Sequence, residues 1–179
     1  MKTNFYSSES FNKDDILFCF KKSFGRFLHK LEVNSQADKL SEMLDEKSSI
    51  KSFTYLDDEL LFFHVGEKTS TSYICTFFCW NYFNKIKSRY FLKSGYNFYK
   101  NMVKKNLVLD LKEKHPDIKH FVIPVNKSRK RKTSYHKFLK YFFKNIESVD
   151  LNFSNYPHHD FFIVDLDKEY EYSVKVFDE

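Results

Sequence analysis

Residues 96 to 143 hold the feature that most constrains the fold of this chain, because they predict a helix, a buried strand and a second helix in succession. The segment begins YNFYKNMVKKNLVLDLKEKHPD, continues as IKHFVIPVN and, after the basic residues KSRKRKT, ends SYHKFLKYFF. The first and last parts repeat apolar residues at helical spacing. The middle is nearly continuous apolar sequence, as in a strand covered on both faces. Pro124 lacks an N–H group and must therefore lie near the end of any ladder that this strand forms.

The first helix is expected over residues 97–114 and the strand over 118–125. The wide apolar stripe of this helix predicts packing on a sheet and consists of Phe98, Met102, Val103, Leu107, Val108 and Leu111. The second helix is expected over residues 134–145, with Tyr135, Phe138, Leu139, Phe142 and Phe143 on its apolar side.

Further helices and strands are expected on both sides of this segment. Asn12, followed by Asp14 and Asp15, is a capping pattern and predicts a helix over residues 12–27. Asn34 and Ser35 introduce a second helix, expected over 36–46. Alternation and turn residues then predict strands at 50–55, 60–65 and 72–80, with turns at 57–59 and 66–71, and later strands at 149–153, 161–166 and 170–177.

The charge is distributed unevenly along the chain. The formal net charge is +6. Residues 147–179 hold nine acidic and two basic residues, a net of −7, so residues 1–146 carry +6 + 7 = +13. A body of that sign attracts phosphate groups, whether in nucleic acid, in an anionic cofactor or at a membrane surface. Docking of the acidic segment on the basic body is the alternative.

The three cysteines, Cys19, Cys75 and Cys79, are an odd number. Together with the lack of a signal-peptide pattern, this favours a reducing compartment over a disulfide framework. The longest strongly apolar run, residues 73–80, is far too short to span a membrane. A cytoplasmic protein is therefore expected.

Up to residue 166 the order of expected elements is helix, helix, strand, strand, strand, helix, strand, helix, strand, strand, and it resembles that of the GNAT superfamily of acyl-CoA-dependent N-acyltransferases. The resemblance rests mainly on residues 50–143. In that family a strand ending near Val-x-x-x-Asn precedes a helix that looks like Ala-x-x-x-Tyr-x-x-x-Gly-Phe. Val122 and Asn126 match the strand pattern, and the helix positions fall on Ser134, Phe138, Phe142 and Phe143.

The resemblance implies a binding site for acetyl-CoA at the start of the 97–114 helix. There the main-chain N–H groups and the helix dipole favour the pyrophosphate, and small residues allow it to approach closely. The family loop looks like Arg/Gln-x-x-Gly-x-Gly/Ala. Gly95 matches it, whereas Leu92 and Asn97 depart from its first and last positions. The implied cofactor-binding residues are Ser94, Gly95, Tyr96, Asn97, Asn126, Lys127 and Arg129.

The catalytic pattern of the family is also altered. Its general acid, a Tyr that protonates the departing CoA thiolate, falls on Phe138, which has no proton to donate. Tyr135 and Tyr141 on the same helix are the candidates to replace it. The alternative is that both are ordinary core or boundary aromatics.

The basic run between the strand and the second helix supports a different partner. A patch of Arg129, Lys130, Arg131, Lys132 and Lys137 can bind a nucleic-acid backbone, or the adenosine phosphates of CoA. A solvated lysine-rich loop is the alternative, and no nucleic-acid-binding motif accompanies the run.

The remaining candidates are isolated residues. Cys75 and Cys79 are expected to be buried thiols rather than zinc ligands, and His158-His159-Asp160 to form a polar loop rather than a metal site. His64 and His120 are candidate general bases if they face a cleft, and satisfied core histidines are the alternative. Glu59 and Glu67 are candidate general bases by position only.

These patterns predict an α/β protein with a GNAT-like mixed, mostly antiparallel central sheet flanked by helices. One domain is expected over residues 1–179, with a helical part at 1–48, a sheet and cofactor-type helix at 49–146, and acidic strands at 147–179. The leading function is transfer of an acetyl group from acetyl-CoA to an amine of a protein or small molecule. The alternatives are a catalytically inactive GNAT-like binding or structural protein, which a phage could encode, and a nucleic-acid-binding protein that uses residues 127–144.

Overall fold

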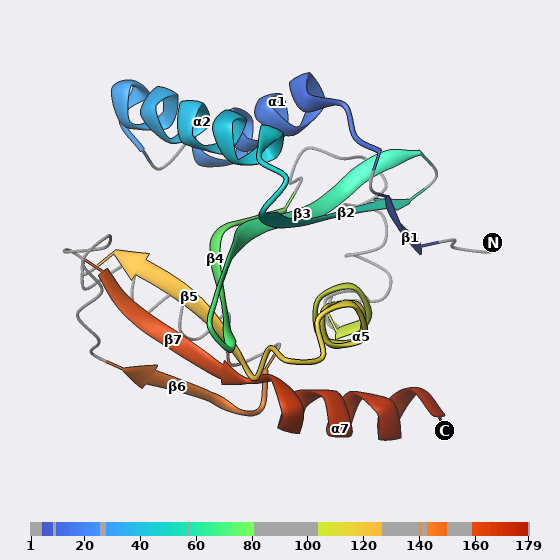
Figure 1. Ribbon diagram of the computed structural model, residues 1–179. Coiled ribbons are helices and arrows are strands. Elements are labelled where there is room, and N and C mark those ends of the chain that lie inside the picture. Colours follow the sequence, from blue (N-terminus) through green and yellow to red (C-terminus); the bar gives the residue numbers. More distant parts are fainter. Residues whose placement is uncertain are drawn as a thin grey trace. The chain divides into compact units, whose positions relative to one another are not determined.

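The computed structural model describes residues 5–8, 10–25, 28–56, 58–80, 104–126, 140, 143–149 and 159–178. The chain divides into two compact units. The first comprises Met1–Glu67 and Phe77–Tyr99, and the second Lys68–Thr76 and Lys100–Glu179. One strand, β4, contributes to both units (Figure 1). That they form one domain remains a prediction.

The first unit contains helices α1 (Lys13–Phe24) and α2 (Lys30–Asp45), which pack against each other. The side chain of Asn12 accepts hydrogen bonds from the main-chain N–H groups of Asp14 and Asp15, at 3.0 and 3.4 Å. This confirms the predicted cap, and α1 ends at Phe24, before the predicted end at 27.

Helix α2 begins six residues earlier than the predicted start at residue 36, so that expectation is wrong. The ring of His29 caps the helix, because its Nδ1 accepts from the main-chain N–H of Leu31 at 3.3 Å. Asn34 and Ser35 lie inside the helix on its exposed face, and Val33 beside them is buried. Histidine is not among the common N-cap residues, and the sequence pattern therefore missed this cap.

The sheet of the first unit has the strand order β1-β2-β3-β4. Its strands are β1 (Phe5–Ser8), β2 (Ser49–Leu56), β3 (Glu59–Thr69) and β4 (Ser72–Trp80). β1 pairs with β2, and β2 with β3, in antiparallel register. The turn expected at 66–71 is shorter, because β3 continues to Thr69 and Ser70 makes the turn with a φ of 55°.

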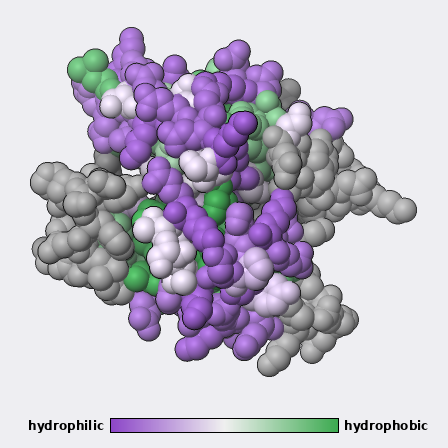
Figure 2. All heavy atoms as spheres, viewed as in Figure 1, coloured by the Kyte–Doolittle hydropathy of each residue, from purple (hydrophilic) through white to green (hydrophobic). Residues whose placement is uncertain are grey.

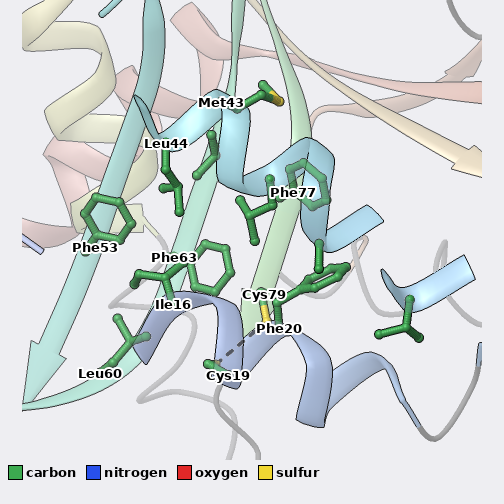
Figure 3. Close-up of a cluster of buried hydrophobic side chains, with 14 residues drawn as sticks. Ile16, Cys19, Phe20, Met43, Leu44, Phe53, Leu60, Phe63, Phe77 and Cys79 are labelled. Carbon is green, nitrogen blue, oxygen red and sulfur yellow. Dashed lines mark hydrogen bonds between the residues drawn. The ribbon is translucent and has the colours of Figure 1, made fainter. Parts of the chain in front are cut away.

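The core of the first unit lies between its two helices and one face of its strands (Figure 3). The ring of Phe20 on α1 meets that of Phe77 on β4 edge to face at 5.4 Å. The buried members of this core are Ile16, Cys19, Phe20, Val33, Ala37, Leu40, Met43, Leu44, Phe53, Leu60, Phe63, Val65, Phe77 and Cys79. Outside the core, the large apolar side chains of Phe18 and Leu31 are exposed. Most of the described surface in Figure 2 is hydrophilic.

The second unit has the strand order β4-β5-β7-β6. Its further strands are β5 (His120–Asn126), β6 (Ile146–Val149) and β7 (His159–Asp165). β5 is parallel to β4, and β7 is antiparallel to both β5 and β6. One face carries a small core of Ile74, Val122 and Phe161, against which Ile163 packs.

Helical segments precede β5 in the second unit. A π-helical turn, η1 (Lys104–Leu109), leads into α5 (Asp110–Lys114). Leu107, Val108 and Leu111 are buried, as predicted for the apolar stripe. The rest of the stripe lies outside the part of the chain that the structure describes.

The largest correction concerns the chain's end. Residues 170–177 were expected to form a strand, but they belong to helix α7 (Leu166–Asp178). The side chain of Asp165 accepts from the main-chain N–H of Lys168 at 3.1 Å and caps this helix. Leu166 and Glu169, three positions apart, are both fully buried, which is helical spacing.

Two smaller differences also lie in this half. Phe143, Lys144 and Asn145 are not helical, so the helix expected over 134–145 ends earlier, and the strand expected to begin at 149 begins at Ile146. With these corrections, the chain is a mixed α/β protein with a mostly antiparallel sheet and flanking helices, as predicted.

Candidate functional site

The parallel pairing of β4 with β5 organises the candidate site. Its registered pairs are Ser72↔His120, Tyr73↔Phe121 and Ile74↔Val122. At the start of the pairing, the main-chain N–H of His120 donates to the carbonyl of Thr71 at 3.2 Å. Parallel strands need a crossover connection, and the η1 and α5 segment lies on that connection.

Pro124 explains where this ladder stops. In a strand, residues two apart direct their N–H groups toward the same neighbour. Since the N–H of His120 points to β4, position 124 faces β4 as well, and a proline there has no hydrogen to donate. Among the described residues of the two strands, the registered pairs indeed end at Ile74↔Val122. The prediction that Pro124 lies near the end of a ladder is confirmed.

On its other side, β5 stays paired beyond the proline. Pro124 lies opposite Phe161 of β7, and the antiparallel register continues to Asn126↔His159. Among the described strands, β7 is therefore the one registered neighbour of the last residues of β5. The carboxyl ends of parallel strands are where ligands bind in open α/β sheets, and Asn126 lies at that end of β5.

Lys112 joins helix α5 to the turn before β5 and to helix α7. Its Nζ donates to the carbonyl oxygens of Pro116 and Ile118, each at 2.9 Å, and forms an ion pair with Asp167 at the start of α7. The turn that leads into β5 is thus attached to two helices. This attachment was not predicted, because it joins residues from three separate segments.

Two side chains of the second unit, Tyr73 and Asp117, have shifted pKa values. Burial, aided by the neighbouring Cys75 thiol, raises the pKa of the Tyr73 hydroxyl well above its usual 10.0. Tyr73 therefore keeps its proton at neutral pH and cannot serve as a base. A hydrogen bond from Lys68 lowers the pKa of Asp117 below its usual 3.8, so that surface carboxylate is ionised at neutral pH.

Most of the predicted site residues lie outside the described residues. Of the predicted cofactor-binding set, the structure places only Asn126, at the end of β5. The others, Ser94, Gly95, Tyr96, Asn97, Lys127 and Arg129, are not described, nor are Tyr135, Tyr141 and Phe138, nor the basic residues Lys130, Arg131, Lys132 and Lys137. Their roles remain predictions.

The isolated candidates are all placed except His158, which is not among the described residues. Cys75 and Cys79 are buried thiols that form no disulfide, as predicted. His64 is buried in β3 with only 1% of its surface exposed, His120 is half-buried at the start of β5, and Glu59 and Glu67 are exposed on β3. His159 and Asp160 open strand β7 rather than forming the expected loop. Within the described segments, no three potential metal ligands gather.

Two buried polar groups were missed by the sequence patterns. The carboxylate of Glu169 accepts from the main-chain N–H of Asn145 at 2.6 Å and from the Asn145 side chain at 3.3 Å. The hydroxyl of Thr54 is buried in β2 without a hydrogen-bond partner among the described residues. The capping pattern at Asp165 was the available signal for Glu169, because it places Glu169 in the first turn of a helix.

Comparison with known proteins gives the fold and little else. No family model matches the chain, and no curated protein matches it. In none of the helices that the structure describes is there a segment apolar and long enough to cross a bilayer.

Solved structures are similar over almost the whole chain. One is the PaiA N-acetyltransferase of Thermoplasma acidophilum in complex with coenzyme A, with 8% identity, a TM-score of 0.56 and coverage of 90% of this chain and 99% of that one. A protein from Desulfovibrio desulfuricans that is assigned to the GNAT acetyltransferases has 13% identity and a TM-score of 0.56, with 92% and 99% covered. A spermidine N-acetyltransferase chimera of Vibrio cholerae SpeG and hSSAT has 7% identity and a TM-score of 0.56, with 92% and 97% covered. The chain therefore has the GNAT fold.

Proposed function

We propose that this protein binds an acyl-CoA, with acetyl-CoA as the expected donor, and transfers the acyl group to an amine. The observation that carries the proposal is a GNAT fold in which the β4–β5 ladder stops at Pro124. A similar structure was solved in complex with coenzyme A, and the basic body of this chain suits an anionic substrate.

In the proposed reaction, acyl-CoA is a substrate rather than a resident cofactor. The amine nitrogen attacks the thioester carbonyl, so that a C–N bond forms and the C–S bond breaks. The nitrogen gives up a proton, and the departing thiolate takes one. We assign the pyrophosphate to Ser94, Gly95, Tyr96 and Asn97, further contacts to Asn126, Lys127 and Arg129, and the proton donor to Tyr135 or Tyr141.

The first test is the melting temperature with and without millimolar acetyl-CoA. A ligand present at 100 times its Kd stabilises the native state by about 2.7 kcal/mol, which for a chain of this length raises Tm by roughly 5 to 10 °C. Gly95→Glu should abolish the shift, because its side chain blocks close approach of the pyrophosphate, and Gly95→Ala should reduce it less. Ser48→Glu, which adds the same charge at an exposed turn, is the matched control and should keep the shift.

The outcomes separate binding from chemistry. No shift in the wild type contradicts the proposal. A shift that survives in Gly95→Glu contradicts the assignment of the pyrophosphate. When acetyl-CoA binds, release of free CoA thiol in the presence of a panel of amines tests transfer of the acetyl group.

A catalytically inactive GNAT-like binding protein is the second candidate. It is favoured by the departures at Leu92, Asn97 and Phe138 from the family pattern. Its expected result is a CoA-dependent shift without thiol release from any amine. The nucleic-acid-binding alternative stays a prediction from the sequence.

A further inference from the structure

Two cysteine thiols meet in the core of the first unit. Cys19 lies on α1 and Cys79 on β4, and their Sγ atoms are 4.0 Å apart (Figure 3). Both are buried, with 5% and 1% of their surfaces exposed, and neither is in a disulfide. The neighbouring rings of Phe20 and Phe77 pack against each other between the same two elements at 5.4 Å. The contact is therefore held by packing on both elements and does not depend on the sulfur atoms alone.

We propose that Cys19 and Cys79 form a disulfide when the folded protein meets a peroxide, and that this bond covalently joins α1 to β4. A disulfide has an S–S length of about 2.05 Å, so the sulfur atoms must approach by roughly 2 Å through rotation of the side chains and small shifts of α1. Hydrogen peroxide is close to water in size, and the oxidation can begin at Cys19, the more exposed of the two thiols.

The chemistry balances without another reactant. Peroxide oxidises one thiolate to a sulfenic acid and leaves as hydroxide, which takes up the proton that the thiol lost and becomes water. The second thiol then attacks the sulfenic sulfur, the S–S bond forms, and a second water leaves. Overall, two thiols are oxidised by two electrons and one peroxide is reduced to two waters. A dithiol reductant reverses the result.

The third cysteine provides an internal control. Cys75 is also buried and lies on the same strand as Cys79. Four residues of extended strand separate their Cα atoms by roughly 13 Å, whereas disulfides require less than about 7 Å. The folded protein should therefore link Cys19 to Cys79. The unfolded chain should favour Cys75 with Cys79, because closing the shorter loop costs less entropy.

The experiment compares connectivity in the two states. The full chain is treated with hydrogen peroxide in native buffer and in concentrated urea, remaining thiols are alkylated, and the linked peptides are identified by mass spectrometry. We expect a Cys19–Cys79 peptide from the native sample, alkylation of Cys75 alone, and mainly Cys75–Cys79 from the urea sample. Cys75→Ala should still give the native link, whereas Cys19→Ala and Cys79→Ala should not.

A thermal readout checks the consequence of the link. The two cysteines are 60 positions apart, and closing a loop of that size restricts the unfolded chain. The oxidised wild type and Cys75→Ala should melt roughly 10 °C higher than their reduced forms. The proposal is overturned by the same mixture of links in native buffer and urea, by a native link that includes Cys75, or by three unlinked thiols in a protein that remains folded.

Discussion

At the scale of single residues, Glu169 is a buried carboxylate that accepts hydrogen bonds from Asn145. Its side chain is fully buried in the first turn of α7. One carboxylate oxygen accepts both hydrogen bonds from Asn145, and the other has no partner among the described residues. The carbonyl of Asn145 in turn accepts from the main-chain N–H of Asp165 at 3.1 Å. Asn145 precedes β6, so Glu169 fixes the start of that strand to the start of α7.

Replacement of Glu169 should therefore cost stability. In Glu169→Ala the N–H of Asn145 loses its acceptor, and we expect the free energy of unfolding to fall by about 1 to 3 kcal/mol. Glu169→Gln keeps an acceptor oxygen and should cost less. Glu171→Ala, at an exposed position of the same helix, is the control. Urea titration followed by circular dichroism measures all three, and an equal loss in Glu171→Ala would contradict the role assigned to Glu169.

At the scale of elements, the sequence patterns succeeded where one signal dominated. Strand β4 has its predicted bounds, because turn residues flank an aromatic and β-branched run. Helix α7 was missed because Tyr170, Tyr172, Val174 and Val176 also alternate at the period of a strand. The helical signal was shorter and lay upstream, in the cap at Asp165.

Pro124 is the element-scale feature that sequence reasoning identified in advance and that can be tested. Pro124→Val restores an N–H group on the side of β5 that faces β4 and should extend the ladder. We expect a higher Tm for the free protein, slow hydrogen exchange of the new amide at position 124, and a smaller shift on addition of acetyl-CoA. Pro116→Val, in the exposed turn before β5, is the control and should leave the acetyl-CoA shift unchanged.

Two results would separate the effect on the ladder from the effect on acetyl-CoA binding. Fast exchange at position 124 in a folded variant would contradict the extension of the ladder. Slow exchange with an unchanged acetyl-CoA-dependent shift in Tm would show that the ladder extends but that acetyl-CoA does not bind where the wild-type ladder ends.

At the scale of the whole molecule, charge is the property that the sequence defines best, whereas contacts between distant segments are the property it defines least. The pairing of Glu169 with Asn145 spans 24 positions and that of Lys68 with Asp117 spans 49. Nothing in the local sequence around either residue announces its partner, because such pairs depend on which strands become neighbours. The excess of +13 over residues 1–146 needs no structure to be counted.

This charge predicts how binding of acetyl-CoA should respond to salt. Between about 0.1 M and 1 M salt the Debye length falls from roughly 10 Å to 3 Å, so the attraction of the basic body for an anionic ligand is screened and the Kd should rise several-fold. When Lys127 and Arg129 contact the phosphates directly, Lys127→Gln with Arg129→Gln should weaken binding at low salt and flatten the salt dependence. Lys30→Gln with Lys47→Gln removes the same charge from exposed positions on α2 and the turn that follows it and should change both far less. Calorimetric titration of the wild type and both double variants at the two salt concentrations measures the Kd values. Equal effects of the two double variants would show that the net charge of the body acts as a whole, against a local phosphate site at residues 127 and 129.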